Sequence, residues 1–263
     1  MHPTRPAAVA GTFYPANPSE ISSLVTGYLG AVDPQQSTTD SPKCLIVPHA
    51  GFIYSGAVAA LGYRLLEKRA ESVSRVVLIG PPHRMPVNGI ALPECAAFST
   101  PLGTVPLDLP ALQQLEQHRL VSRFAAAHES EHSLEVQLPF LQLALPHFQL
   151  LPLIVGHCSA EAVAEILDLL WGGDETLIVC STDLSHYHPY DTACLIDRKT
   201  CARITQAEAS IQPEEACGCS GLNGLLVAAK RRGLMIRQLG YCNSGDTAGP
   251  KEGVVGYGAF AIG

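Results

Sequence analysis

The chain has 263 residues, of which 47% are apolar and 16% charged, and its 24 Asp and Glu outnumber its 17 Lys and Arg to give a formal charge of −7. This composition excludes a disordered, charge-rich protein. The negative charge argues against a protein that binds nucleic acid through a basic face.

The same sequence indicates where the protein works. No apolar run reaches the roughly 18 residues that a membrane-crossing helix needs, and the N-terminal sequence lacks the apolar core of a signal peptide. The nine cysteines form no C-x-x-C pair, and the C-G-C sequence at 217–219 is too short for a zinc knuckle, so we interpret it as a flexible loop. We expect reduced thiols in a cytoplasmic protein that is one domain over residues 1–263 and contacts no membrane.

Short apolar runs alternate with helix-length segments after a polar stretch at 33–42, which we interpret as a surface loop. Unbroken runs of Val, Ile and Leu are typical of strands covered on both faces. The alternation predicts an α/β fold, a three-layer α/β/α sandwich around a mixed, mainly parallel sheet. The predicted strands span 43–48, 75–80, 149–155, 176–180, 234–239 and 253–262, and the predicted helices span 55–69, 133–145 (interrupted by a proline), 159–171 and 220–232.

Four of these strands end just before a His, an Asp or both. His49 follows the first strand and His83 the second. Asp183 and His186 follow the fourth, and Asp246 lies shortly after the fifth. Ligands of such sheets bind on the loops that follow the carboxyl ends of the strands, so we expect these side chains to converge. Two His and a carboxylate bind first-row divalent metals and leave positions open, as in non-haem iron(II) oxygenases, although the same set can hold zinc for hydrolysis.

Residues 128–132, HESEH, match the H-E-x-x-H signature of zinc proteases. That chemistry requires both His on one helix face with the Glu as base. Ser133 and Glu135 look like the opening turn of the following helix, so we place His128 in the loop before it and interpret the match as chance.

Six segments in order resemble the Memo family, whose bacterial members are called AmmeMemoRadiSam system protein B, and the resemblance spans nearly the whole chain. The resemblance implies the fold of class III extradiol dioxygenases, which use a 2-His-1-carboxylate iron(II) site, with His49 and His83 as metal ligands. The segments are TFYPANP at 12–18, PHAGFIYSG at 48–56, LIGPPHR at 78–84, EHSLEVQLPFL at 131–141, STDLSHY at 181–187 and NSGDTAG at 243–249.

The third ligand is predicted from the last of these segments. Animal Memo proteins supply a Cys there, which aligns with Thr247 in this chain. Because Asp is a good ligand for divalent ions and Thr a poor one, we predict Asp246, with Cys242 or water as the alternatives.

Three further residues are predicted to do the chemistry near the metal. By resemblance, Asp183 and His186 lie near it, where a His can transfer protons and an Asp can hold a His in one tautomer. The alternative for Asp183 is a helix N-cap. His132 is expected to face the same pocket on the substrate or oxygen side, or else to lie in solvent at the start of a helix.

These features lead to three hypotheses about function. The first is an iron(II) enzyme, with zinc or copper as alternative metals, that acts on a small substrate such as a catechol. The second is a module that binds a peptide or protein without turnover, in a pathway with a radical SAM protein and an AMMECR1-like protein, as the bacterial family name implies. The third is a zinc hydrolase that uses the same ligands.

Overall fold

The computed structural model describes residues 3–33 and 42–263, so 34–41, most of the predicted surface loop, lies outside the described residues. Within them, a mixed sheet of nine strands follows the order β10-β12-β2-β9-β3-β8-β4-β7, and β11 also pairs with β12. Its strands are β2 (Cys44–Val47), β3 (Arg75–Gly80), β4 (Ile90–Leu92), β7 (Val121–Arg123), β8 (Gln149–Val155), β9 (Thr176–Ser181), β10 (His186–His188), β11 (Ile236–Asn243) and β12 (Val254–Ile262).

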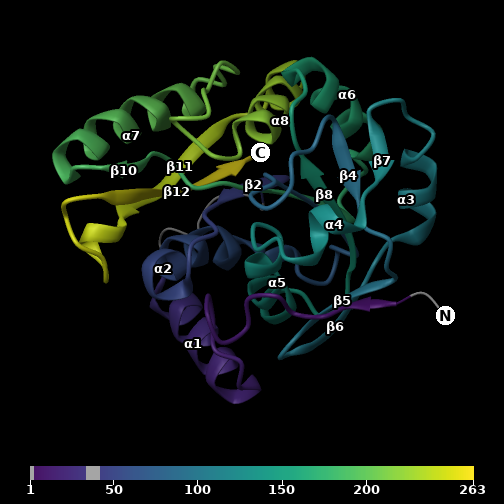
Figure 1. Ribbon diagram of the computed structural model, residues 1–263, viewed down its shortest axis with the longest axis horizontal. Coiled ribbons are helices and arrows are strands. Elements are labelled where there is room, and N and C mark those ends of the chain that lie inside the picture. Colours follow the sequence, from purple (N-terminus) through teal and green to yellow (C-terminus); the bar gives the residue numbers. More distant parts are fainter. Residues whose placement is uncertain (1–2, 34–41) are drawn as a thin grey trace.

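Helices cover both faces of this sheet, and β1 (Thr4–Arg5), β5 (Ala97–Thr100) and β6 (Gly103–Pro106) form a second, three-stranded sheet. Figure 1 shows α6, α7 and α8 on one face of the large sheet and α1, α2 and α5 on the other. The predicted three-layer α/β sandwich is confirmed. The helices are α1 (Pro18–Ala31), α2 (Phe52–Tyr63), α3 (Leu109–Leu115), α4 (Ala125–Glu129), α5 (Leu138–Ala144), α6 (Ala160–Leu170), α7 (Tyr190–Thr205) and α8 (Cys219–Arg231), with shorter 3-10 turns η2 (Arg64–Arg69), η3 (Glu135–Gln137) and η4 (Ser244–Asp246).

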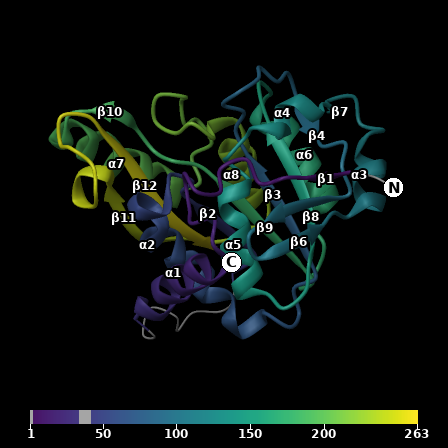
Figure 2. The same cartoon turned by 60° about the horizontal axis from the view of Figure 1, so that its bottom comes forward.

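The centre of the sheet is parallel, as the apolar runs predict. β2 pairs in parallel with β9, β9 with β3, and β3 with β8, and nearly all their residues are buried. The strands that flank this centre run in the opposite direction, because β12 is antiparallel to β2 and β4 is antiparallel to β8. Figure 2 shows β12 crossing from the centre of the sheet toward β10.

The predicted helices and strands differ from the structure mainly at their ends. The strands expected at 75–80 and 149–155 have those bounds, whereas β11 begins and ends later than the predicted 234–239. The helix expected at 133–145 begins at Leu138, because Pro139 takes a first-turn position and η3 precedes it. Among residues 3–33 and 42–263, no helix combines the length and apolarity needed to cross a membrane.

A buried carboxylate ties the N-terminal segment to the body of the protein. Glu135 is fully buried, and its Oε2 accepts a hydrogen bond of 2.6 Å from Arg5 Nη1. The Tyr14 hydroxyl donates to Oε1 at 2.6 Å. The backbone N–H groups of Ala8 and Val9 donate to the same carboxylate at 2.8 and 2.9 Å. Each carboxylate oxygen therefore has two donors, which is the condition for a stable buried charge.

Arg5 is as fully paired as the carboxylate. Its Nε donates to the carbonyl oxygen of His128 at 2.6 Å, and its Nη2 donates to that of Glu131 at 2.7 Å. The N-terminal strand thus holds the turn at 128–135 from outside.

We expect Glu135→Gln to lower the free energy of unfolding by about 3–5 kcal/mol, because it leaves the buried Arg5 charge unpaired. Urea unfolding followed by circular dichroism measures the loss. Glu67→Gln is the matched control, since Glu67 is exposed and pairs with Arg64 on the surface, and it should cost about 0.5 kcal/mol or less. Equal losses in the two variants would show that the network adds nothing.

Candidate functional site

The carboxyl ends of three neighbouring parallel strands deliver the polar side chains to one edge of the sheet. His49 follows β2, His83 follows β3, and Asp183 follows β9, which lies between them. Their convergence, expected from the sequence, is confirmed for these three. Together with His132 and His186 they line a cavity of about 750 Å³.

Three imidazoles form a compact group in this cavity. His49, His83 and His132 each offer a ring nitrogen, and these nitrogens lie within 4.8 Å of one another. The His83 and His132 rings stack at 4.5 Å between centroids, and the His49 ring meets them edge-on at 5.1 and 5.4 Å. In the part of the chain that the structure describes, no other group of three or more His, Cys, Asp or Glu could hold a metal ion in this way.

Glu131 orients His83. Its Oε1 lies 2.9 Å from His83 Nδ1 and also accepts the backbone N–H groups of His132 and Ser133, each at 2.9 Å. Burial raises the pKa of Glu131, but the His83 hydrogen bond and charge, with the backbone donors, lower it overall to about 2. An ionised carboxylate only accepts hydrogen bonds. His83 Nδ1 therefore carries a hydrogen, and Nε2 is the nitrogen left for another partner.

His49 is buried, with its ring 1% exposed. Its Nδ1 lies 2.9 Å from the Ser181 hydroxyl, and its Nε2 lies 3.3 Å from Cys217 Sγ. Burial lowers the pKa of His49 well below its usual value, and the other cavity histidines lower it further. The ring is therefore neutral, which is the form that binds metal ions.

His132 has a ring nitrogen without a partner. Its Nδ1 is buried and makes no hydrogen bond; it lies 3.2 Å from Glu131 Oε1 without the alignment that a bond requires. Its ring contacts Phe13 at 4.7 Å between centroids, and burial lowers its pKa to about 4. A neutral, half-buried imidazole with an unpaired nitrogen fits a metal ligand.

Asp183 and His186 lie in the same cavity, where the sequence places them. Asp183 Oδ1 accepts the backbone N–H of His49 at 2.7 Å, and its Oδ2 lies 3.9 Å from His49 Nε2. It therefore holds the backbone of His49 and makes no hydrogen bond to its ring. Burial raises the pKa of Asp183 to about 7. Burial, followed by the charge of His83, lowers the pKa of His186.

Cys217 is a site residue that the sequence analysis interpreted as part of a flexible loop. The loop before α8 packs closely over the end of β9, and Gly218 makes this contact possible. A Cβ atom at position 218 would lie only 2.8 Å from the Cβ of Thr182. The Gly218 N–H donates to the Thr182 hydroxyl at 2.9 Å. A Cys beside a glycine that packs this closely was the only signal available in the sequence.

Asp246 lies outside the His group, and its carboxylate is engaged elsewhere. Its Oδ2 accepts the Asn243 N–H at 3.0 Å in a capping box, and its Oδ1 accepts the Tyr190 hydroxyl at 2.6 Å. Asn243 pairs with Gly256 of β12, whereas β2 meets β12 at Phe260. β12 lies between β11 and β2 in the sheet, and Asp246 is not among the residues that line the cavity. The group of side chains that could hold an ion contains His132 with His49 and His83, and Asp246 lies outside it.

Cys242, the alternative third ligand, and Thr247 are not among the residues that line the cavity. Cys242 is half-buried and packs against the cluster of Val58, Tyr257 and Ala259. Burial raises the pKa of its thiol to about 11. Thr247 is exposed, and its hydroxyl donates to the Ser244 carbonyl.

The two histidines of the zinc-protease match lie in different structural environments. His128 ends up in α4, which stops at Glu129, and its Nε2 lies 2.9 Å from the carbonyl oxygen of Ala91. His132 lies beyond that helix, in the cavity. Because the two His do not share a helix face, the protease arrangement is absent at 128–132.

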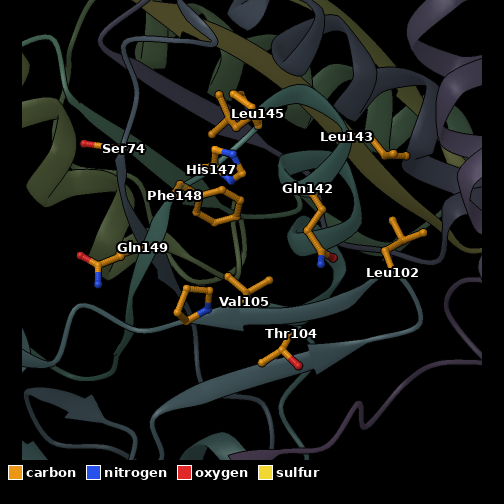
Figure 3. A pocket seen from close by; sticks show the side chains of 12 residues that line it. Ser74, Leu102, Thr104, Val105, Gln142, Leu143, Leu145, His147, Phe148 and Gln149 are labelled. Atoms are coloured by element: carbon orange, nitrogen blue, oxygen red, sulfur yellow. The ribbon is translucent and has the colours of Figure 1, made fainter.

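A second hollow of about 610 Å³ lies at the opposite end of the parallel strands, beside Ser74 before β3 and Gln149 at the start of β8. Figure 3 shows Phe148 and His147 across from Val105 of β6. His147 is the one titratable side chain that the structure places in its lining. The cavity with the His group is therefore the candidate active site.

Comparison with known proteins identifies the family and supports the fold. The model of the family described as Memo-like protein matches residues 5–261. A MEMO1 family protein of Methanopyrus kandleri is 34% identical, covering 98% of this chain and 98% of its own. One of Aquifex aeolicus is also 34% identical, covering 96% and 97%. An uncharacterized protein of Escherichia coli K12 shares the fold, with a TM-score of 0.53 and 16% identity over 84% of this chain and 99% of its own.

The buried His128 makes stability depend on pH. Burial lowers its pKa from 6.5 to about 4, so between these values the unfolded chain takes up a proton that the folded protein does not. Its contribution is complete above pH 6.5 and is lost as pH falls toward 4, by about 3 kcal/mol. We expect His128→Gln to show a smaller fall in the urea-unfolding free energy from pH 7.5 to 4.5 than the unsubstituted protein. An equal fall would contradict this assignment.

Proposed function

The chain belongs to the Memo family, and from this premise and the cavity geometry we propose that it is a metal-dependent enzyme that acts on a small substrate with iron(II). The observation that carries the proposal is the group of three His nitrogens within 4.8 Å in a 750 Å³ cavity. Imidazoles suit iron, zinc and copper, and three protein ligands leave positions open on such an ion.

The donors present fit such an ion. The Nδ1 atoms of His49 and His83 are hydrogen-bonded to Ser181 and Glu131, which leaves their Nε2 atoms for the ion, and His132 adds a third ring nitrogen within 4.8 Å. Cys217 Sγ, 3.3 Å from His49 Nε2, can join as a fourth donor to the same ion. Glu131 supports the set from outside, as carboxylates do for metal-bound His.

The other cavity residues have defined tasks in this proposal. When bound, the ion supplies a Lewis acid for a substrate hydroxyl and a redox partner for oxygen. His186, in the wall of the same cavity, takes the proton from that hydroxyl. Asp183 holds the His49 backbone, and Arg84 on the cavity wall supplies a positive charge for an anionic substrate group.

Metal content and oxygen consumption test the proposal together. We expect protein purified and loaded with iron(II) without oxygen to bind about one ion, measured by mass spectrometry, and to consume oxygen with a panel of catechols. His49→Ala and His83→Ala should each lower metal affinity at least about 100-fold, because even the supporting residues of metal ligands are worth 10–100-fold.

His147→Ala is the matched control, since His147 is exposed in the distant hollow, and it should change neither quantity. Iron binding without oxygen uptake would contradict the enzyme proposal and favour a protein that binds a ligand without turnover. Stoichiometric zinc with esterase or amidase activity would make the protein a hydrolase. Full metal occupancy in both His→Ala variants would refute the site.

The ligand set makes a second prediction that separates Cys217 from Asp246. We expect cobalt(II)-loaded protein to show a thiolate-to-metal absorption band that disappears in Cys217→Ser. Asp246→Asn should keep the band and the metal affinity, because the Asp246 carboxylate serves the η4 turn. A loss of metal in Asp246→Asn with an unchanged spectrum in Cys217→Ser would restore the set predicted from sequence.

A further inference from the structure

The hydroxyl of Ser181, the last residue of β9, lies among three buried polar groups. It donates to the Ser133 carbonyl oxygen at 2.6 Å, accepts from Gln137 Nε2 at 2.8 Å and lies 2.9 Å from His49 Nδ1. Ser181, Gln137 and His49 are each at most 1% exposed. Bulk water therefore does not compete for any of these hydrogen bonds, so each polar atom must be satisfied by its neighbours.

The Gln137 amide has one possible orientation. Its Nε2 lies 2.9 Å from the Pro48 carbonyl oxygen, and its Oε1 accepts the Tyr63 hydroxyl at 2.8 Å. Exchanging the two amide atoms would set an oxygen against the Pro48 carbonyl oxygen, and both only accept. Gln137 is therefore the donor toward Ser181.

The donors and acceptors around Ser181 determine which ring nitrogen of His49 carries a hydrogen. A serine hydroxyl has one hydrogen and two acceptor sites. The Ser133 carbonyl takes the Ser181 hydrogen, and Gln137 fills one acceptor site. The remaining site faces His49 Nδ1, which must carry a hydrogen, because otherwise two acceptors would meet at 2.9 Å.

We propose that Ser181 is a positioning residue that fixes His49 as its Nδ1–H tautomer and so presents the unprotonated Nε2 to the cavity. The inference deepens the proposed function and rests on it for its consequence, since only an unprotonated ring nitrogen binds a metal ion. Asp183, the residue expected from the sequence for such a role, instead bonds the His49 backbone.

His49 and His83 both carry a hydrogen on Nδ1, but different groups accept the hydrogen bond from it. The Glu131 carboxylate accepts a hydrogen bond from His83 Nδ1, whereas the neutral Ser181 hydroxyl accepts one from His49 Nδ1. The hydroxyl adds no negative charge beside the buried ring, so its effect is to select a tautomer. Removing it should change which nitrogen is protonated without introducing or removing a formal charge.

Nuclear magnetic resonance of the metal-free protein with ¹⁵N-labelled histidine tests this directly at pH 7.5. Long-range ¹H–¹⁵N correlations report which ring nitrogen is protonated, and the spectrum of His49→Gln identifies the His49 signals. We expect protonated Nδ1 and unprotonated Nε2. In Ser181→Ala the signals should move toward the Nε2–H form, and Zn²⁺ affinity, from competition with a chromophoric chelator, should fall 10–100-fold.

Ser181→Thr, which keeps the hydroxyl, should retain both the tautomer and the affinity. Thr200→Val is the control for loss of a buried hydroxyl elsewhere, since Thr200 is fully buried and bonds the Ile196 carbonyl in α7; it should change neither readout.

Protonated Nε2 in the unsubstituted protein would overturn the inference, and this result needs no variant to fold. An unchanged tautomer in Ser181→Ala would also overturn it. If the tautomer changes as expected and no form of the protein binds metal, the inference stands and the proposed function fails.

Discussion

The carboxylate of Glu135 is the constraint on which the cavity depends. It is a fully buried charge, and its partners come from the first fourteen residues, above all Arg5. The same guanidinium binds the carbonyl oxygens of His128 and Glu131. The turn that carries Glu131 and His132 is therefore held on one side by the N-terminal strand. On the other side, Ser133 bonds the end of β9. Two of the three imidazoles thus owe their positions to this turn, His132 directly and His83 through Glu131.

The parts of this structure that depend on runs of several similar residues could be predicted from the sequence. Unbroken Val, Ile and Leu runs located the central strands, and side chains just past them converged because β2, β9 and β3 lie side by side in parallel. The strands β4 and β7 have three residues each, too few to show a period, and the helix α7 is rich in polar residues. Their burial comes from neighbours that the local sequence does not reveal.

The site was predictable only as far as strand order was. Asp246 follows a strand that runs in the same direction as β2, but β12 lies between the two strands, and Asn243 and Tyr190 bond the Asp246 carboxylate outside the cavity lining. The order of strands in a sheet cannot be read from any one strand. Cys217 was not predicted as a site residue because its loop reaches the cavity only through the close packing of Gly218 against Thr182. Ser181 and Gln137 were read only as parts of larger motifs, since their roles appear only when all hydrogen-bond partners are known.

The partners that build the cavity lie far apart in the chain, and this separation has a consequence for how the protein comes into being. Arg5 and Glu135 are 130 residues apart, and His49 and Asp183 are 134 apart. During synthesis Arg5 has no partner carboxylate until Glu135, near the middle of the chain, has left the ribosome. The cavity around His49 cannot form until β9 and Asp183 have also been made. Contacts of this range slow folding. The unfinished chain therefore passes through a period in which its apolar strands are exposed and its charges unmatched, when it is most in need of protection by chaperones.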